Sequence, residues 1–462
     1  MPFQFQLWHG LTLLHVAAVA SGLLLYVSLT HAGRQRRPPA AAFAWVLALV
    51  AFPYLALPVY LLLGTRKLAH AQAPASPAPG MAEPANTWSA RLTGGLDLPP
   101  ARHCHTITLR TDGADALRDL LALLDGASSH IDIEMFIFRL DAVGTPVVAA
   151  LARAHARGVQ VRVLLDGLGA FIGHRATRRA LQQAGATVRW FAPLRLRLRP
   201  QFGRGNLRNH RKLILVDGVR MWSGGRNLAQ AYFLDAPQAP HWRDLSFTID
   251  GGITTDAQAG FARDWALAGG EAAPMPDAAT AARHGPLAQL LPSGPDRRDD
   301  TAHDVFLGAL YRANARVLLA TPYFVPDDTL QHALLQAARR GVQVSLLLPA
   351  RSNHRLADIA RQRSLRELAA AGARIHLLPC MLHAKLLMVD AGLASTGSVN
   401  FDGRSLFLNY ELNVLFHDPA QIAALAAWFA AQRAESSPYA PRAPGWWRDV
   451  GEGLVRAVGF QL

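Results

Sequence analysis

The apolar positions of this 462-residue chain fall into two patterns, and the first is concentrated at the N-terminus. Leu11–Leu29 contains 19 consecutive uncharged residues and Ala40–Leu63 contains 24, so each run is long enough to cross a bilayer as a helix. Pro53 and Pro58 kink the second run without excluding it from a membrane. A cleaved signal peptide is the alternative for the first run, but no basic segment precedes it and a second apolar run follows. We therefore expect a two-helix transmembrane hairpin over residues 1–68.

Beyond this segment, short apolar runs alternate with amphipathic stretches. Residues 69–100 are rich in Ala and Pro, which predicts a tether. The following stretches predict helices at Ala114–Leu124, Pro146–Arg157 and Arg175–Ala184, and strands at Ile131–Phe138, Val159–Leu165 and Thr187–Phe191. The same order returns in the second half, with helices at Asp304–Ala313, Thr329–Arg340 and Leu356–Ala371, and strands at Val317–Phe324, Val342–Leu348 and Arg374–Leu378.

The two halves are copies of one unit. The pentapeptide Arg-Gly-Val-Gln-Val occurs at 157–161 and again at 340–344. We predict an α/β fold of two similar α-β-α sandwich lobes that pack about a pseudo-two-fold axis, by the logic of symmetric dimers. The expected segments are a first lobe at 101–268, an inter-lobe connection at 269–300, a second lobe at 301–435 and a C-terminal tail at 436–462.

One polar motif interrupts the apolar strands of both halves at equivalent places. His210, Lys212 and Asp217 form the pattern H-x-K-x4-D, and His383, Lys385 and Asp390 repeat it. Gly224, Gly225 and Asn227 follow the first copy, and Gly397, Ser398 and Asn400 follow the second. Equivalent positions are separated by 173 residues throughout. Because five matched positions share one offset, coincidence is a poor explanation.

Strand geometry indicates what the motif can do. The apolar residues after each lysine predict a buried strand, on which side chains two residues apart share a face. The histidine and the lysine of each copy therefore point the same way. Asp217 is seven residues from His210, an odd number that places it on the opposite face or in the following turn, where a structural role is favoured. Asp217 and Asp390 nevertheless complete the motif and are counted among the candidate catalytic residues.

The chain is strongly basic, with 47 Lys and Arg residues against 33 Asp and Glu residues and a formal net charge of +14. Only three of the cations are lysines, namely Lys67, Lys212 and Lys385. A compact ammonium and a planar guanidinium are not interchangeable at a crowded phosphate, so the two motif positions look chemically constrained. The positive charge fits either an anionic lipid surface or nucleic acid, and the apolar runs favour lipid. Cys104 and Cys380 provide neither a disulfide framework nor a metal-ligand spacing.

Three further features each have two interpretations. The Arg-rich stretch from Arg195 to Arg208 is either a surface for anionic headgroups or a solvated edge strand. Trp446 and Trp447 mark either contact with a membrane interface or ordinary core packing. Three arginines lie between the apolar runs, against Arg66 and Lys67 after them, and this difference does not decide the membrane orientation.

These motifs resemble those of the phospholipase D superfamily, and the ensemble is similar to the bacterial cardiolipin synthases. The resemblance begins with the two N-terminal apolar runs and extends at least to Trp428. The stretches that carry it are Asn209-His210-Arg211-Lys212, Gly224–Leu228, Trp242-Arg243-Asp244, Ser293–Pro295, Thr321–Pro326, Gly397–Asp402 and Asn409-Tyr410-Glu411. The Ala/Pro-rich tether and the tail from Pro441 depart from the pattern.

The resemblance implies one composite site to which both lobes contribute. His210 attacks the phosphorus of phosphatidylglycerol and His383 protonates the departing glycerol, which leaves a phosphohistidine intermediate. A second phosphatidylglycerol then accepts the phosphatidyl group, giving cardiolipin and glycerol. The supporting residues implied are Lys212, Lys385, Asn227, Ser398 and Asn400 at the phosphate oxygens, with Asp244 and Glu411 orienting the histidines.

The same resemblance implies no metal, no cofactor and no nucleic-acid partner. Phosphatidylglycerol and other anionic phospholipids are the expected partners, and the expected location is multi-pass in the inner membrane of a bacterium. The sequence leaves two other functions open. With water as acceptor, the same site makes a phospholipase D or a phosphodiesterase on nucleic acid. A membrane scaffold with a relict fold is disfavoured because both His–Lys pairs are intact.

Overall fold

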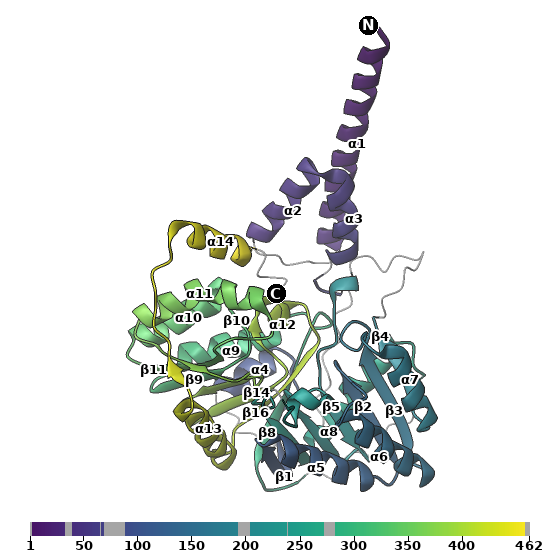
Figure 1. Ribbon diagram of the computed structural model, residues 1–462, viewed down its shortest axis with the longest axis vertical. Coiled ribbons are helices and arrows are strands. Elements are labelled where there is room, and N and C mark those ends of the chain that lie inside the picture. The colour runs from purple at the N-terminus through teal and green to yellow at the C-terminus, as the bar shows by residue number, and fades with distance from the viewer. Residues whose placement is uncertain are drawn as a thin grey trace.

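The computed structural model describes residues 2–32, 39–64, 66–68, 88–192, 204–237, 239–271 and 282–457. Three N-terminal helices, α1 (Pro2–Ala32), α2 (Pro39–Ala51) and α3 (Pro53–Leu63), project from one end of an α/β body (Figure 1). Residues 69–87 of the expected tether and residues 193–203 of the Arg-rich stretch lie outside the described residues. Within the expected tether, the structure contains helix α4 (Trp88–Gly95).

The body consists of two lobes. The elements of the first are β1 (Arg102–Arg110), α5 (Gly113–Asp125), β2 (His130–Met135), α6 (Gly144–Ala156), β3 (Gln160–Asp166), α7 (His174–Gln183), β4 (Thr187–Phe191), η1 (Arg204–Asn206), β5 (Leu213–Val216), β6 (Arg220–Gly224), η2 (Gln230–Tyr232), β7 (Ser246–Gly251) and α8 (Ile253–Leu267). Those of the second are β8 (Leu287–Ser293), α9 (Thr301–Arg312), β9 (Arg316–Ala320), β10 (Phe324–Val325), α10 (Asp328–Arg339), β11 (Gln343–Pro349), α11 (Arg355–Ala370), β12 (Arg374–Leu378), β13 (Leu386–Val389), β14 (Leu393–Gly397), β15 (Phe401–Asp402), α12 (Gly403–Phe407), β16 (Glu411–Phe416), α13 (Pro419–Ala434) and β17 (Ser437–Pro438), followed by α14 (Trp446–Ala457).

The two sheets have the same strand order, which confirms the predicted duplication. The first runs β1-β7-β6-β5-β2-β3-β4 and the second β8-β16-β14-β13-β9-β11-β12, with β17 added at its edge. Strands β1 and β8 pair antiparallel, with Arg102 opposite Ala288 and His103 opposite Leu287, so the sheets are continuous. Strand β8 lies inside the segment expected as a mere connection, and the second lobe therefore begins earlier than we placed it.

The repeated pentapeptide ends a helix in both lobes. Gly158 and Gly341 have φ angles of 91° and 87°, the left-handed conformation that commonly follows a helix. At the other end of the helices, Asp112 accepts a hydrogen bond from the Asp115 N–H at the start of α5, and Asp327 caps α10 in the same way. The predicted helices and strands match the observed ones within a few residues, because these local signals repeat in both halves.

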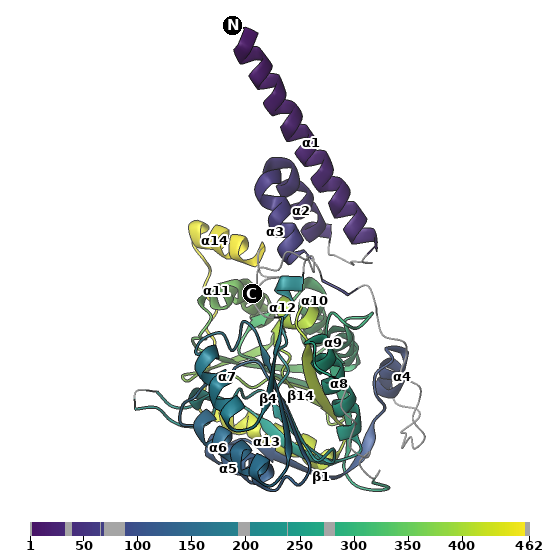
Figure 2. The same ribbon diagram turned by 90° about the vertical axis from the view of Figure 1, so that its right-hand side faces the viewer.

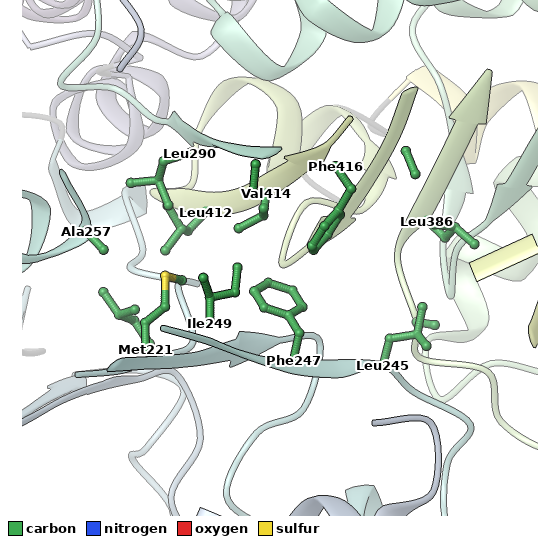
Figure 3. Packing of buried hydrophobic residues seen from close by; sticks show 14 of the residues in the cluster. Met221, Leu245, Phe247, Ile249, Ala257, Leu290, Leu386, Leu412, Val414 and Phe416 are labelled. Carbon is green, nitrogen blue, oxygen red and sulfur yellow. The ribbon is translucent and has the colours of Figure 1, made fainter. Parts of the chain in front are cut away.

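Helices cover both faces of the sheets, with α8 and α13 on the inner side, where the two lobes also pack against each other. Helices α5 and α6 bury their apolar sides on the outer face of the first sheet, and α9, α10 and α11 do so on the second. Figure 3 shows the inner faces, where Phe247 and Ile249 of β7 lie opposite Val414 and Phe416 of β16. Phe247 and Phe416 meet edge to face with ring centroids 5.4 Å apart. Burial of both inner faces holds the lobes in one fixed arrangement.

The N-terminal segment differs from the predicted hairpin. Within α1, Thr12–His31 is long and apolar enough to cross a membrane, and it is the one such helix in the described residues. The second apolar run is divided at Phe52 (φ −138°, ψ 57°) into α2 and α3, with 13 and 11 residues. Pro53 disfavours a helical conformation for the residue before it, which explains the break. The structure thus contains one helix of spanning length and two short helices that pack on it.

The chain after α3 binds the second lobe. Arg66 and Lys67 both pair with Asp300, at 2.6 Å and 2.9 Å, and the Leu68 N–H donates to the Pro295 carbonyl over 2.9 Å. Helix α3 also contacts η1 of the first lobe. The N-terminal helices are therefore attached to both lobes of the body at one end.

Candidate active site

A short backbone bridge between the lobes places the first motif histidine. Asn209 pairs in parallel with Tyr410 of the second lobe. The Tyr410 N–H donates to the Arg208 carbonyl, and the His210 N–H donates to the Tyr410 carbonyl, both over 2.9 Å. Because Glu411 follows Tyr410 directly, this bridge carries a carboxylate of the second lobe to the histidine of the first.

An equivalent bridge places the second histidine. Arg243 of the first lobe pairs in parallel with Leu382. The Arg243 N–H donates to the Met381 carbonyl over 2.8 Å, and the His383 N–H donates to the Arg243 carbonyl over 2.7 Å. Asp244 follows Arg243, so the first lobe supplies a carboxylate to the second lobe's histidine. The two bridges are thus equivalent under the pseudo-two-fold symmetry that relates the lobes.

The histidines and acids are thus exchanged between lobes. The Nδ1 atom of His210 lies 3.0 Å from both carboxylate oxygens of Glu411, and the Nδ1 atom of His383 lies 2.7 Å from Oδ2 of Asp244. Both acids are fully buried. A carboxylate at Nδ1 keeps the proton on that nitrogen, which leaves the Nε2 lone pair of each neutral imidazole available for chemistry. The pairing partners could not be read from the sequence.

The two lysines are buried in the same place. Lys212 and Lys385 are 0% and 2% exposed. Lys212 Nζ donates to the His210 carbonyl over 2.6 Å, whereas Lys385 Nζ bonds the His383 carbonyl and lies 3.0 Å from Nε2 of His383. Each ammonium also acts on the opposite lobe, because Lys385 lowers the pKa of His210 and Lys212 lowers the pKa of His383. The four groups therefore form one electrostatic site.

Burial and mutual repulsion shift the protonation of this site toward neutral forms. Burial, together with Lys212 and against Glu411, lowers the pKa of His210 to about 4, and burial together with Lys385 lowers the pKa of His383 to about 3. Burial also lowers the pKa of Lys385 to about 8 and that of Lys212 well below its usual range. A phosphodiester anion among these groups reverses the effect, because a negative charge favours each protonated form. The site is thus built for an anion.

The two acids, in contrast, are held in their charged forms. Burial disfavours the carboxylate of Asp244, but the neighbouring His383 and its hydrogen bond outweigh burial and lower the pKa of Asp244. The same balance, with His210 and Lys212 as the favourable partners, lowers the pKa of Glu411. Both acids therefore remain ionised and acceptor-only beneath their histidines.

The turn residues after each motif lie beside the same groups. A Cβ atom at Gly225 would stand 2.1 Å from Oδ1 of Asp244, so this position cannot carry a side chain while the acid keeps its place. Its equivalent Ser398 is fully buried, accepts the Leu412 N–H over 2.8 Å and hydrogen-bonds Glu411. This position therefore lies against the acid in each lobe: Gly225 leaves space for Asp244, and Ser398 hydrogen-bonds Glu411.

The two asparagines have different surroundings. Oδ1 of Asn227 accepts the Ile137 N–H over 3.1 Å. Oδ1 of Asn400 is buried without a hydrogen-bond partner among the described residues, while its side chain also hydrogen-bonds Asp402. A phosphate-binding role for these asparagines and for Ser398 stays a prediction.

The third motif residue does not belong to the site. Asp217 accepts hydrogen bonds from the backbone N–H groups of Ser128, Ser129 and His130, and Asp390 accepts those of Asn314, Ala315 and Arg316. Strand β5 separates Asp217 from Lys212, and β13 separates Asp390 from Lys385. The catalytic role predicted for these aspartates does not agree with their position, since they tie the far ends of the strands to the preceding loops.

Several residues that sequence reasoning missed hold the motif loop in place. The Asn209 N–H donates to Oδ2 of Asp166 over 2.9 Å, and its side chain bonds Glu134. Arg211 forms a buried ion pair with Asp264. Burial and Asp264 raise the pKa of Glu134 well above its usual range, so Glu134 is the protonated member of this cluster. These acids come from strands and a helix with no motif of their own.

Aromatic rings also flank the histidines. Phe136 meets His210 edge-on with centroids 4.9 Å apart, and Tyr232 meets His383 at 4.9 Å while Trp242 lies 5.6 Å from it. These rings exclude water and restrict rotation of the imidazoles. Within the described part of the chain, no group of three or more His, Cys, Asp or Glu side chains is arranged to bind a metal ion.

Comparisons with known proteins agree with this geometry. The family model described as "Cardiolipin synthase, PLD-like domain" matches residues 120–265 and 306–433. The chain is 32% identical over 421 residues to "Cardiolipin synthase A" of Pseudomonas entomophila (strain L48), covering 86% of this chain and 87% of the relative. It is 33% identical over 332 residues to "Cardiolipin synthase 2" of Bacillus cereus (strain ATCC 14579), covering 71% of this chain and 64% of the relative.

The fold has a solved counterpart in the phosphatidylserine synthase of Haemophilus influenzae Rd KW20. That structure superimposes with a TM-score of 0.62 over 81% of this chain and all of the other, at 14% sequence identity, which supports the fold. The paired H-x-K motifs, the exchanged acids and the match of both lobes lead to one assignment. The chain belongs to the phospholipase D superfamily, in the family of cardiolipin synthase PLD-like domains.

Proposed function

We propose that this protein is a cardiolipin synthase that transfers a phosphatidyl group from one phosphatidylglycerol to another. The observation that carries the proposal is the single buried site in which two imidazoles, each with an acid from the opposite lobe, lie among two lysines. The relatives named cardiolipin synthase, matched over most of the chain, supply the substrate class.

In the first step, Nε2 of His210 attacks the phosphorus of the donor lipid. The bond between phosphorus and the headgroup glycerol oxygen breaks, and His383 donates the proton that the departing alkoxide needs. Glu411 supports the attack because it holds the His210 proton on Nδ1 and stabilises the positive charge that develops on the ring. The products of this step are free glycerol and a phosphatidyl group bound to His210.

The second step reverses the first with a different alcohol. A headgroup hydroxyl of the second phosphatidylglycerol attacks phosphorus, and His383, now neutral, takes its proton. The phosphorus–nitrogen bond breaks and His210 is regenerated. Cardiolipin leaves, and His383 is again protonated for the next cycle, so proton and bond counts balance.

One asymmetry supports this division of roles. Both lysines bond the backbone carbonyl of their own motif histidine, but Lys385 Nζ also lies 2.7 Å from Nδ1 and 3.0 Å from Nε2 of His383. The His210 Nε2 atom is therefore the less encumbered nucleophile. The lysines stabilise the equatorial oxygens, where charge accumulates in the transition state, and they do so in a site with little water to screen them.

The location of the substrate fits the position of the membrane helices. Helix α1 contains a segment long enough to cross a bilayer, and α3 contacts η1, which precedes the motif loop of the first lobe. We propose that the protein resides in a bacterial membrane and takes phosphatidylglycerol from it. This arrangement lets the phosphate reach the site while the acyl chains stay in lipid.

The test is a product analysis with purified protein and phosphatidylglycerol labelled in both the headgroup and the acyl chains, in mixed micelles. The proposal predicts cardiolipin and free glycerol in equal amounts, and loss of both in His210→Ala and His383→Ala. Phosphatidic acid as the main product would instead indicate hydrolysis. Denaturing His383→Ala at alkaline pH, where a phosphorus–nitrogen bond is stable, after supplying a donor that has a good leaving group is expected to retain lipid on His210, and a protein without bound lipid would contradict the assignment of the nucleophile.

A further inference from the structure

The C-terminal helix α14 presents its apolar side to solvent. Trp446 and Trp447 are 67% and 80% exposed, and Val450 is 41% exposed. The two indole rings meet edge-on with centroids 4.3 Å apart. Residues at 446, 447 and 450 lie on one side of a helix with 3.6 residues per turn. The helix therefore carries a contiguous apolar stripe that the described part of the chain leaves exposed.

The opposite side of α14 attaches it to the second lobe through charges. Glu452 is 4% exposed and accepts hydrogen bonds from Arg366 of α11 over 2.7 Å and from Arg448 over 3.0 Å. Asp449 also lies 3.6 Å from Arg366. Val455 packs beside Ala357 and Ala360 on the same side. A surface helix of a globular protein normally buries its apolar side and exposes its charges, so this orientation is inverted.

The position of α14 indicates what meets the stripe. In both views the helix lies at the end of the body from which α1, α2 and α3 project (Figures 1 and 2). The loop that carries His210 belongs to the same end, because η1, which leads into this loop, contacts α3. The apolar stripe therefore lies on the end of the body that carries the N-terminal helices.

Two further apolar tips lie at this end, one on each lobe. The segment after β3 exposes Leu168, Phe171 and Ile172, at 47%, 52% and 69%. In the second lobe, Leu356 and Ile359 in the first turns of α11, which follows β11, are 46% and 41% exposed. Strands β3 and β11 are equivalent in the duplicated fold, so the tips flank the site on both sides.

We propose that α14 is an interfacial membrane anchor, and that Trp446, Trp447 and Val450 enter the headgroup region of an anionic phospholipid bilayer. Tryptophan favours this region because its ring is apolar and its N–H is polar, and a helix with one apolar and one charged side lies in the plane of the interface. With α1 it gives the body two separate attachments to lipid. Two attachments fix both the height and the tilt of the site above the bilayer.

The benefit of such an anchor rests on the proposed lipid substrate. Insertion of α14 into a bilayer, however, can be measured whether or not the protein turns over lipid. A headgroup phosphate that must reach two buried histidines while its acyl chains remain in lipid requires the body to lie close to the bilayer surface. The tips at 168–172 and 356–359 complete a rim around the site. The competing occupant of the stripe is a second copy of the chain.

The first test locates the indoles. Full-length wild-type protein and the Trp446→Phe/Trp447→Phe variant are reconstituted into phosphatidylglycerol vesicles with and without lipid brominated near the headgroup. The difference in emission between the two proteins belongs to the Trp pair. Quenching of this difference by brominated lipid, with protection from aqueous acrylamide, is expected. Quenching by acrylamide alone would overturn the proposal, and neither result depends on catalysis.

The second test measures the consequence. Trp446→Ser/Trp447→Ser is expected to lower cardiolipin formation several-fold in vesicles, and to leave it equal to wild type in detergent micelles, where no flat surface needs to be bound. The matched control is Tyr311→Ser, which removes an aromatic residue that is 49% exposed near the end of α9 that leads into β9. Equal activity of all three proteins in vesicles, or a dimer in detergent that the Trp variant dissociates, would refute the anchor.

Discussion

Exchange of acids between lobes makes Glu411→Gln the most informative perturbation. The carboxylate lies 3.0 Å from Nδ1 of His210 through both oxygens and is fully buried. Glutamine has nearly the same shape, so packing around the site is preserved. The substitution removes the negative charge. It also replaces a group that can only accept a hydrogen bond from Nδ1 with an amide that can instead donate one through its NH2 group.

The size of the effect follows from these two losses. A hydrogen bond to a charged group contributes about 1.5–3 kcal/mol, which alone predicts a fall in kcat of roughly 10- to 100-fold. If the amide donates to Nδ1, the proton moves to Nε2 and the nucleophilic lone pair is lost. The corresponding Asp-to-Asn change in a Ser-His-Asp triad lowers kcat by about 10⁴. We therefore expect a fall between about 10² and 10⁴ in kcat, with KM little changed.

The assay is initial-rate formation of cardiolipin in mixed micelles, with a thermal melt of each variant to show that it is folded. The matched control is Glu367→Gln, which alters a half-exposed carboxylate on α11 bonded to Arg363. That control should keep wild-type activity. If folded Glu411→Gln retained more than about a tenth of wild-type kcat, the loss would be smaller than one charged hydrogen bond implies, and the orienting role of this acid would be wrong.

Three other predictions test the remaining parts of the site. Lys385→Arg should lower kcat by roughly 10²-fold, because a planar guanidinium does not fit the place of a compact ammonium at a position that is 2% exposed. The larger side chain should also lower the melting temperature, so the steady-state assay is made at a temperature where a thermal melt shows the variant to be folded. Asp217→Asn should lower the free energy of unfolding by about 1–3 kcal/mol while activity per folded molecule is kept. Backbone donors outweigh burial and lower the pKa of Asp217 to about 2, so the stabilisation is present above its ordinary pKa of 3.8 and is lost as pH falls toward 2, which urea titrations at several pH values will reveal. Binding of vanadate, a phosphate mimic, at pH 7 should be accompanied by proton uptake, because burial has lowered the pKa of His210 to about 4 and that of His383 to about 3 and a bound anion raises both. Calorimetry in buffers of different ionisation enthalpy measures this uptake, and proton release would contradict the prediction.

Stability should also depend on pH through these histidines. Because the folded protein holds His210 and His383 neutral at pH values where the unfolded chain protonates them, the unfolded state binds more protons between the folded pKa values and about 6.5. Stability therefore rises with pH across that window.

Local signals in the sequence were sufficient for the elements and for the duplication. Apolar runs, helix caps and the glycines at 158 and 341 depend on neighbours within a few residues, and they act in the same way in both halves. The second apolar run is divided into two helices for an equally local reason, since the chain breaks at Phe52 before Pro53, and the length of the run does not indicate that break. The Asp217 result followed from strand parity, which already favoured a structural role.

By itself, the sequence determined the two α/β units, the His–Lys pairs that share a strand face, and the family to which the motifs belong. Only the tertiary structure decided that Glu411 serves His210 and Asp244 serves His383, because these pairs join residues 201 and 139 positions apart across the lobe boundary. It also decided the supporting cluster around Glu134 and the outward orientation of Trp446. Contacts of this kind depend on how two buried faces pack against each other, and no periodicity along a single chain encodes that arrangement.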